Sequence, residues 1–135
     1  MAHVLRSAAN RVDLHFTRQF ATRQLTYQQW AILMALRAKP AGKLTDLARS
    51  QSYDAGALSR LVDDLARRGL IARERCTNDR RVMMLSLTGQ GEELLQEMLP
   101  QVVAAWNGLL ENMNGADIDS LTSLLMRLTI GGTLA

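Results

Sequence analysis

Residues 44–88 contain the pattern that most restricts how this chain can fold. Two helical segments, 44–50 and 54–68, flank the tripeptide 51–53, and two short apolar segments follow at 70–75 and 82–87. Asp54 is predicted to cap the second helix, and Gly69 to end it. Apolar residues recur along it as one buried stripe: Leu58, Leu61, Val62 and Leu65. This order of elements predicts a winged helix-turn-helix, which places one helix in a DNA major groove.

The remaining face of the second helix carries small and polar residues. They are Asp54, Ala55, Gly56, Ser59 and Arg60. Small residues allow close approach to a groove, and Ser59 and Arg60 can donate hydrogen bonds to bases or phosphates. At the start of the first helix, Thr45 is expected to act as a cap or, with Lys43, to contact phosphate. The alternative is an ordinary pair of helices in an all-helical core, with Arg60 solvated. That alternative predicts no basic ribbon directly afterwards.

The expected two-stranded ribbon is basic. Thr77, Asn78 and Asp79 are turn formers, and four arginines surround them: Arg73, Arg75, Arg80 and Arg81. An arginine at a ribbon tip can enter a minor groove, where negative potential is concentrated. Asp79 cannot favour DNA by its charge, so we expect it to accept a hydrogen bond from a neighbouring arginine. A solvated hairpin edge is the alternative for these charges.

The segments that flank this unit are predicted to be helical, which makes the fold mainly α with a small β-wing. A helix over 4–22 and another starting near Tyr27, with Thr26 and Gln29 as its capping box, come first. A long helix begins at Gly91, with a possible kink at Pro100. Asn114 is a candidate cap for a last helix that ends at Gly131–Gly132. The apolar stripe of the long helix is wide, which favours an intersubunit surface over a self-contained bundle.

Composition and charge limit the functional classes. Apolar residues make up 47% and charged residues 21% of 135 residues, as in one globular subunit. Residues 1–40 carry +5, residues 41–88 +3 and residues 89–135 −5, and arginine supplies 14 of the 16 basic residues. Arginine suits phosphate and guanine recognition, although a GC-rich genome also favours it. No apolar run reaches the length of a membrane span and no signal peptide is evident, so a cytoplasmic location is expected.

The chain resembles the MarR/SlyA family of winged-helix transcription regulators over nearly its whole length. The most specific motif is Asp79-x-Arg81, followed by Leu87–Thr88 and Gly91, which matches the family's D-x-R and LT-x-x-G signature. The segment also resembles SlyA-type wings because a cysteine, Cys76, comes directly before the turn of the wing. Peroxide-sensing members keep a reactive cysteine in the first helix instead. This difference argues against the usual peroxide mechanism.

The resemblance implies a homodimer whose terminal helices interleave and whose two winged-helix lobes bind a pseudo-palindromic operator in double-stranded DNA. It divides the chain into N-terminal arm and scaffold helices (1–40), a DNA-binding lobe (41–88) and C-terminal dimerisation helices (89–135). By that likeness residues 54–68 read the major groove. The wing residues Arg80 and Arg81 reach into the minor groove, and Asp79 braces them. Family members are often repressors that a small phenolic or aromatic carboxylate releases from DNA.

Candidates for an effector pocket lie on the first two helices: Arg11, His15, Arg18, Tyr27, Trp30 and Met34. Cations beside an aromatic wall suit an aromatic carboxylate. The alternatives are that Trp30 belongs to the core, that the arginines face solvent and that His15 is an interface residue.

The sequence favours neither an enzyme nor a cofactor or metal protein. His3 and His15 are twelve residues apart, and Asp63 and Asp64 are adjacent on a helix and point in different directions. The single Cys76 excludes an intrachain disulfide and a cysteine-based zinc site. The ligand-responsive regulator has two alternatives. They are an architectural DNA-binding protein without an effector, and an interaction module on the same fold that does not bind DNA.

Overall fold

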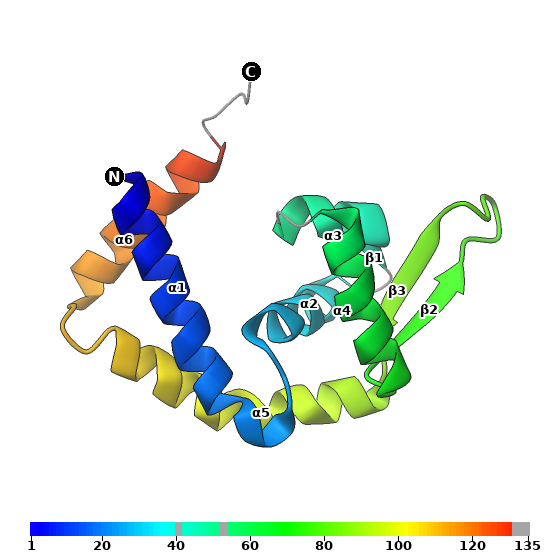
Figure 1. The fold of residues 1–135 in the computed structure, drawn as a ribbon, viewed down its shortest axis with the longest axis horizontal. Coiled ribbons are helices and arrows are strands. Elements are labelled where there is room, and N and C mark those ends of the chain that lie inside the picture. Colours follow the sequence, from blue (N-terminus) through cyan, green and yellow to red (C-terminus); the bar gives the residue numbers. More distant parts are fainter. Residues whose placement is uncertain (40–41, 52–53, 131–135) are drawn as a thin grey trace.

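The computed structural model describes residues 1–39, 42–51 and 54–130, and it is mostly helical with one small sheet (Figure 1). The elements follow in chain order. They are α1 (Ala2–Gln19), η1 (Ala21–Arg23), α2 (Tyr27–Ala38), β1 (Gly42–Lys43), α3 (Leu44–Gln51), α4 (Ala55–Arg67), β2 (Ile71–Arg75), β3 (Met83–Leu87), α5 (Gly89–Leu109) and α6 (Gly115–Ile130).

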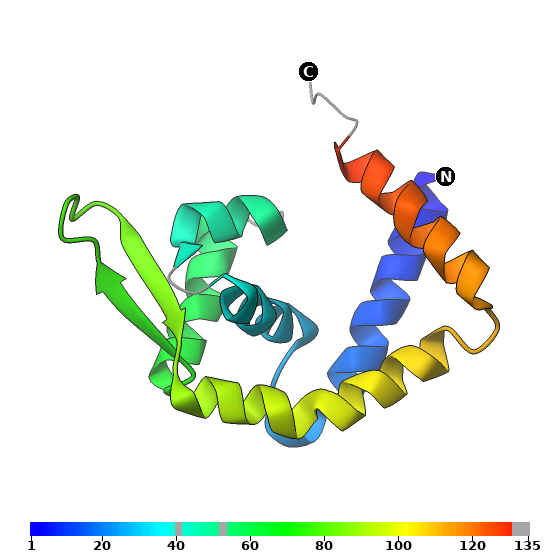
Figure 2. The same ribbon diagram turned by 180° about the vertical axis from the view of Figure 1, so that it is seen from behind.

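The molecule has two parts, which α5 joins (Figure 2). Helices α2, α3 and α4 and the sheet form a lobe at one end of α5, while α1 and α6 lie at its other end (Figure 1). Pro100 lies inside α5, and Figure 2 shows that this helix bends along its length. Proline lacks the amide hydrogen that would continue the helical hydrogen bonding, which accounts for a bend there. The expected winged helix-turn-helix with flanking helices is therefore confirmed.

The sheet has three antiparallel strands in the order β1-β3-β2, where the sequence predicted two. β2 and β3 form the hairpin, with Ile71 opposite Leu87 and Arg75 opposite Met83. The extra strand β1 pairs Gly42 with Leu85. A strand of two residues is too short to show the alternation that identifies strands in a sequence. β1 joins the start of α3 to the middle of β3.

One core unites the elements of the lobe. Phe20, Ile32, Leu33, Leu58, Leu65, Leu85, Leu95 and Met98 are among its fully buried members. The predicted stripe of α4 is confirmed, because Leu58, Val62 and Leu65 are buried and Leu61 packs beside them. Phe16 near the end of α1 and Phe20 directly after α1 are buried, whereas Val4 at the start of the predicted stripe is 65% exposed. The first half of α1 therefore extends beyond the core of its own chain.

Most of the predicted helix ends are confirmed. Thr26 and Gln29 form the capping box of α2, Asp54 accepts from the amide of Ala57 at 2.7 Å, and Asn114 accepts from the amide of Asp117 at 2.8 Å. Gly69 has a φ of +75°, as expected of the residue that ends α4.

One predicted cap and two predicted helix boundaries are wrong, and two further predictions lie outside the described residues. α3 begins at Leu44, so Thr45 is inside its first turn and is not the cap. α5 begins at Gly89, two residues earlier than predicted, because the hydroxyl of Thr88 caps it by accepting from the Gly91 amide at 3.1 Å. The helix expected over 4–22 ends at Gln19, and a 3-10 turn follows. The turn at Ser52–Tyr53 and the stop at Gly131–Gly132 lie outside the described residues.

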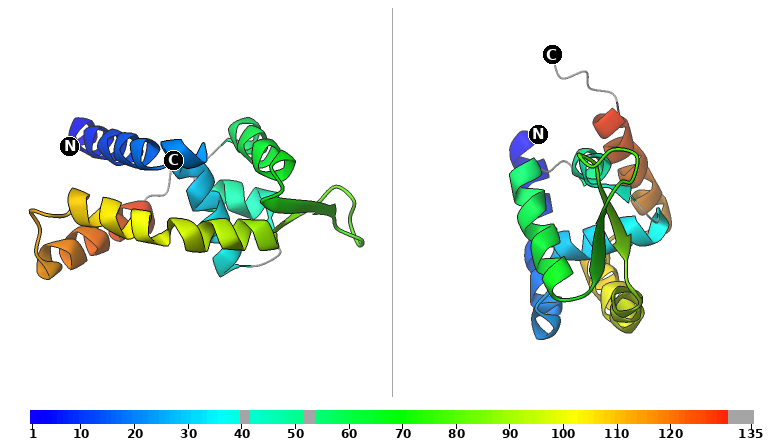
Figure 3. Two further views of the ribbon diagram at one scale, coloured as in Figure 1. Left: turned by 90° about the horizontal axis from the view of Figure 1, so that it is seen from below. Right: turned by 90° about the vertical axis from the view of Figure 1, so that its right-hand side faces the viewer.

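The far end of the molecule exposes a large apolar surface. No residue of α6 is buried, and six large apolar side chains along it are at least 40% exposed: Leu121, Leu124, Leu125, Met126, Leu128 and Ile130. Leu99 and Val103 add to this surface from α5. Figure 3 shows α1 and α6 apart from each other, so neither helix covers the other within one chain. Within the described residues, no helix is long and apolar enough to cross a membrane.

Candidate nucleic-acid interface

Helix α4 presents a polar face beside a firmly buried one. Its buried stripe packs into the core, which leaves Gly56, Arg60, Asp63 and Arg67 exposed and Ser59 half-buried. Asp54 is exposed, and its carboxylate is already engaged as the cap of the helix. Ala55 is the first residue of α4, and its side chain lies outside the described part. A Cβ added at Gly56 would contact only the Asp54 carboxylate, at 3.4 Å, so the first turn is open to close approach.

The tip of the β2–β3 hairpin is held by its own side chains. The Asp79 carboxylate accepts from the Arg81 backbone amide at 3.1 Å and from Arg81 Nε at 3.2 Å. The Arg75 guanidinium donates to the backbone carbonyl of Arg80 at 2.8 Å. The expectation that Asp79 accepts from a neighbouring arginine is confirmed. Arg75 lies at the end of β2 and closes the same turn from the opposite strand.

The structure divides the arginines of the lobe into two groups. Arg68, Arg73 and Arg75 each bind a carboxylate or a carbonyl of the lobe or the segment before it, with Arg73 paired to Asp63 on α4. Arg60 and Arg80 form no ion pair with any residue that the structure describes, and both are exposed. Arg81 bonds only to Asp79 among those residues, and its side chain is 91% exposed. Exposed arginines available to a polyanion therefore lie on α4 and at the hairpin tip.

The two predicted phosphate contacts lie at the start of the helix-turn-helix. Lys43 is on β1, where it pairs with Met84 of the hairpin, and its side chain is exposed. Thr45 is exposed in the first turn of α3. Amide groups in the first turn of a helix are free to donate to an anion, which suits a phosphate at this position.

The six candidate pocket residues do not form one group. Trp30 is 6% exposed and packs against Phe20 with ring centroids 5.6 Å apart, so it is a core residue. Tyr27 is half-buried beside Phe16 at 4.8 Å. His15 is half-buried facing Gly108 of α5, and its Nε2 has no hydrogen-bond partner among the described residues. Arg11 and Arg18 are exposed on the same side of α1 as His15, at helical spacings of four and three, and Met34 is 37% exposed.

Burial, and after it the negative charge of Asp13, raises the pKa of Tyr27 above its ordinary value of 10.0. Its phenol is therefore protonated at neutral pH and remains a hydrogen-bond donor. A phenol that donates a hydrogen bond can bind a carboxylate, although the negative charge of Asp13 opposes an anion close to Tyr27.

Sequence reasoning missed a polar network that holds α4 in place. Gln29 of α2 is buried, and its amide donates to the Asp64 carboxylate on α4 at 2.7 Å. Arg68, at the end of α4, donates to the carbonyls of Arg23 and Gln24 at 2.9 and 2.8 Å. The available signal was the i, i+4 spacing of Asp64 and Arg68, which predicts a local ion pair and nothing about contacts with residues more than forty positions away.

Comparison with known proteins identifies this arrangement. The model of the MarR family matches residues 25–83. The HTH-type transcriptional repressor YetL of Bacillus subtilis (strain 168) is 30% identical over 118 residues, which is 86% of this chain and 69% of YetL.

Two solved structures are similar over almost their whole length. Bordetella bronchiseptica BpsR, in a study of how 6-hydroxynicotinic acid regulates its DNA binding, has a TM-score of 0.86 and 27% identity, covering 95% of this chain and 97% of BpsR. A probable transcriptional regulator from Pseudomonas aeruginosa has a TM-score of 0.86 and 28% identity, with coverage of 95% and 96%. These relatives are regulators and not enzymes, as the sequence predicted. The chain therefore belongs to the MarR family of transcription regulators, and the resemblance drawn from its sequence is confirmed.

Proposed function

We propose that this protein is a dimeric, sequence-specific repressor that binds a pseudo-palindromic operator and is released by a small aromatic effector. The observation that carries the proposal is the position of the exposed arginines. Arg60 is exposed on a helix whose opposite face is buried, and Arg80 and Arg81 are exposed at the tip of a hairpin. A helix with open first residues fits a major groove, and a tip arginine fits the adjacent minor groove.

In this proposal α4 reads bases through residues of its first two turns: Asp54, Ala55, Gly56, Ser59 and Arg60. Arg60 has the geometry to donate two hydrogen bonds to a guanine, while Asp54 fixes the start of the helix. At the wing, Arg80 and Arg81 supply the minor-groove contact. Asp79 and Arg75 set the shape of the tip. Lys43 and Thr45 bind phosphates of the backbone, which fixes the register on the duplex.

We infer the dimer from the apolar surface of α6, α1 and the end of α5. An isolated helix of 16 residues with no buried side chain gains little from packing and is marginal in water, so α6 needs a covering partner. A second copy of the chain supplies a matching surface, as in most small oligomers with two-fold symmetry. In this assignment residues 1–40 provide the arm and scaffold, 41–88 the DNA-binding lobe and 89–135 the dimerisation helices. A regulator of this kind acts on DNA in the cytoplasm.

We propose the effector to be an aromatic carboxylate or a phenol, bound between α1 and the lobe. BpsR, at 27% identity, is regulated by 6-hydroxynicotinic acid, which is both a hydroxylated aromatic ring and a carboxylic acid. In this chain Arg11 and Arg18 supply cations on the same side of α1 as His15, and His15 and Tyr27 supply hydrogen-bonding groups. Met34 provides an apolar contact. Trp30 supports the site from the core, because it is already packed against Phe20.

A gel-shift titration tests the proposal. The protein is mixed with the DNA upstream of its own gene and, in parallel, with random duplex of equal length and composition. We expect tighter binding to the upstream DNA and two-fold symmetry in a footprint. Addition of salicylate or 6-hydroxynicotinic acid should weaken the complex, and Arg11→Ala combined with Arg18→Ala should reduce that response without weakening DNA binding. Equal affinity for both duplexes would contradict the proposal.

A further inference from the structure

The segment between α1 and α2 is a short, bent connector, defined here as residues 20–26. It consists of Phe20, the 3-10 turn η1, then Gln24 in the left-handed region with a φ of 51°, Leu25 and Thr26. A non-glycine residue in that region is energetically unfavourable, so neighbouring contacts must hold it there. The connector joins the α1 arm to the DNA-binding lobe.

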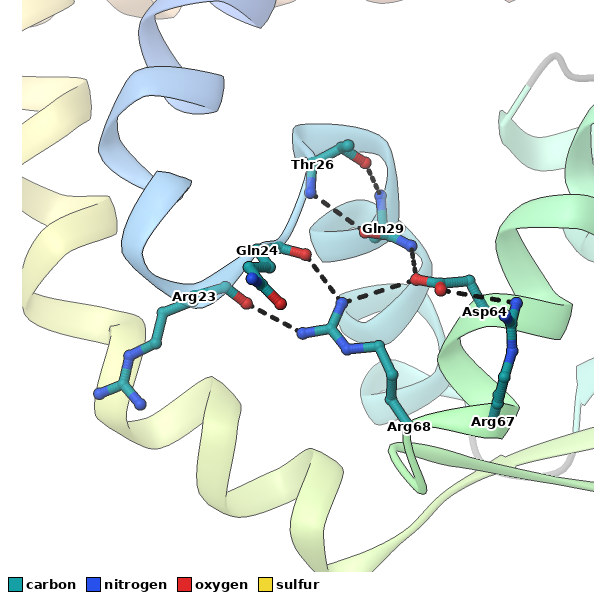
Figure 4. A network of polar contacts seen from close by, with 7 residues as sticks. All are labelled: Arg23, Gln24, Thr26, Gln29, Asp64, Arg67 and Arg68. Atoms are coloured by element: carbon teal, nitrogen blue, oxygen red, sulfur yellow. Dashed lines mark hydrogen bonds and ion pairs between the residues drawn. The ribbon is translucent and has the colours of Figure 1, made fainter.

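Arg68 makes the contact that fixes the connector (Figure 4). One nitrogen of its guanidinium donates to the carbonyl of Arg23 at 2.9 Å, and the other donates to the carbonyl of Gln24 at 2.8 Å. Because one planar guanidinium binds two successive carbonyls, it fixes the orientation of the connector backbone as well as its distance from Arg68. Because Arg68 is the residue that ends α4, this contact joins the recognition helix to the arm.

Asp64 holds Arg68 in this position. Its carboxylate lies 3.6 Å from the Arg68 guanidinium and 2.7 Å from the amide of Gln29, which is buried in α2 (Figure 4). On the other side of the connector, the Arg23 guanidinium forms an ion pair with Glu97 of α5 at 2.9 Å. Helices α2, α4 and α5 therefore all bind at or next to the same connector.

We propose that Arg68, braced by Asp64, is a positioning residue for operator recognition. It sets the angle between the recognition helix and the arm that reaches the second subunit, and thereby selects the spacing between half-sites. This inference rests on the proposed dimeric DNA binding. If Arg68 acted only as a surface cation, its loss would weaken binding to every duplex by the same factor, whatever the half-site spacing. If Arg68 is a positioning residue, its loss changes how strongly the protein prefers one half-site spacing over the others.

The test compares Arg68→Met with wild type and with Arg67→Met. Methionine keeps the apolar part of the side chain and removes the guanidinium. Arg67 is the matched control, because it is the preceding residue and its side chain is 75% exposed. Among the described residues its guanidinium pairs only with Asp64, at 3.7 Å. Affinity is measured on duplexes that carry the same two half-sites at spacings from two base pairs below to two above the optimum.

We expect Arg68→Met to bind about tenfold more weakly than wild type at the optimal spacing and nearly as well as wild type at the others. The profile of affinity against half-site spacing is then flatter than that of wild type. For Arg67→Met, affinity should depend on half-site spacing as in wild type, even if the affinity is lower at every spacing. Arg68→Lys should fall between them, because one ammonium group cannot replace a planar fork. An unchanged profile for Arg68→Met, or an equal loss at every spacing, would overturn the inference.

Hydrogen–deuterium exchange tests the contact without DNA. The amides of Arg23, Gln24 and Leu25 are hydrogen-bonded within the connector. In Arg68→Met they should exchange about tenfold faster, while the middle of α4 keeps its protection. Unchanged exchange would show that Arg68 does not hold the connector and would overturn the inference at its first step. If wild type itself showed no spacing preference, the proposed dimeric operator binding would fail together with the spacing role, while exchange would still report on the contact.

Discussion

The side-chain amide of Gln29 donates to the carboxylate of Asp64 at 2.7 Å and joins the start of α2 to the recognition helix α4. The same amide group uses its oxygen to accept from the backbone of Thr26 at 3.2 Å. Gln29 is the buried polar side chain of the described core, and both the oxygen and the nitrogen of its amide have a hydrogen-bond partner. A side chain that caps one helix and binds another fixes their relative position, which α4 needs in order to present its polar face.

Replacing Gln29 with methionine should reduce the free energy of unfolding by about 1–3 kcal/mol. The change leaves the Thr26 amide without its acceptor and removes one donor from Asp64. Urea unfolding measures the loss. Gln28→Met is the control, since Gln28 is the adjacent residue and forms no such link between helices; we expect a change within about 0.5 kcal/mol. Equal losses for both variants would show that the link contributes nothing.

Gly91 and Gly89 should respond in opposite ways to alanine. A Cβ at Gly91 would lie 2.6 Å from the Leu87 side chain and closer still to the Leu70 carbonyl, whereas a Cβ at Gly89 meets nothing within 4 Å. We expect Gly91→Ala to destabilise the fold by about 1–3 kcal/mol or more. Gly89→Ala should be neutral or stabilising by up to about 1 kcal/mol. Thermal unfolding of the two variants checks both, and a stable Gly91→Ala protein would mean that α5 approaches the hairpin less closely.

The raised pKa of Tyr27 predicts a loss of stability in alkaline solution. Burial keeps the phenol protonated in the folded state at pH values where the unfolded chain has lost that proton. The folded state then binds more protons than the unfolded one, so its stability falls as pH rises above the ordinary value of 10.0. Tyr27→Phe removes this contribution. Urea unfolding between pH 8 and 11 should show a shallower decline for Tyr27→Phe, and parallel curves for the two proteins would contradict the assignment.

Arg81→Ala should weaken operator binding by about 1–3 kcal/mol if the arginine makes a specific contact. Asp79→Ala should weaken it as well, because Arg81 then loses the carboxylate that orients its side chain. Arg127→Ala on α6 removes the same charge from the other end of the molecule and is the control, provided that size-exclusion chromatography shows its oligomeric state unchanged. Fluorescence anisotropy at low and high salt measures all three. Unchanged affinity for Arg81→Ala at both salt concentrations would remove the wing from the interface.

The parts of the fold that follow local rules could be predicted from the sequence. The caps at Asp54, Asn114 and the Thr26–Gln29 pair depend on residues three positions apart, and all three were confirmed. The end of α4 at Gly69 depends on the backbone angle of that one residue, and it was confirmed too. The stripe of α4 follows from helical periodicity. Asp79 and Arg81 are neighbours in the sequence, and their bond was also predicted.

The features that depend on distant residues could not be predicted in this way. The bonds from Arg68 to the connector span 44 and 45 residues, and no local spacing indicates them. β1 is a strand because β3 lies beside it, not because Gly42 and Lys43 favour one. The apolar pattern of α6 was visible in the sequence, but the same pattern fits a buried helix and an intersubunit surface. In the structure no residue of α6 is buried, so α6 is not a helix buried within its own chain.

Selection of binding sites from a library of random duplexes tests the central claim most directly. Wild-type protein is incubated with the library, and bound DNA is recovered and sequenced over several rounds. We predict enrichment of an inverted repeat whose half-site centres lie about one helical turn apart, roughly 10–10.5 base pairs. Recovery of no enriched sequence, or of a single site without two-fold symmetry, would contradict a dimer that reads DNA through α4 and the hairpin tip.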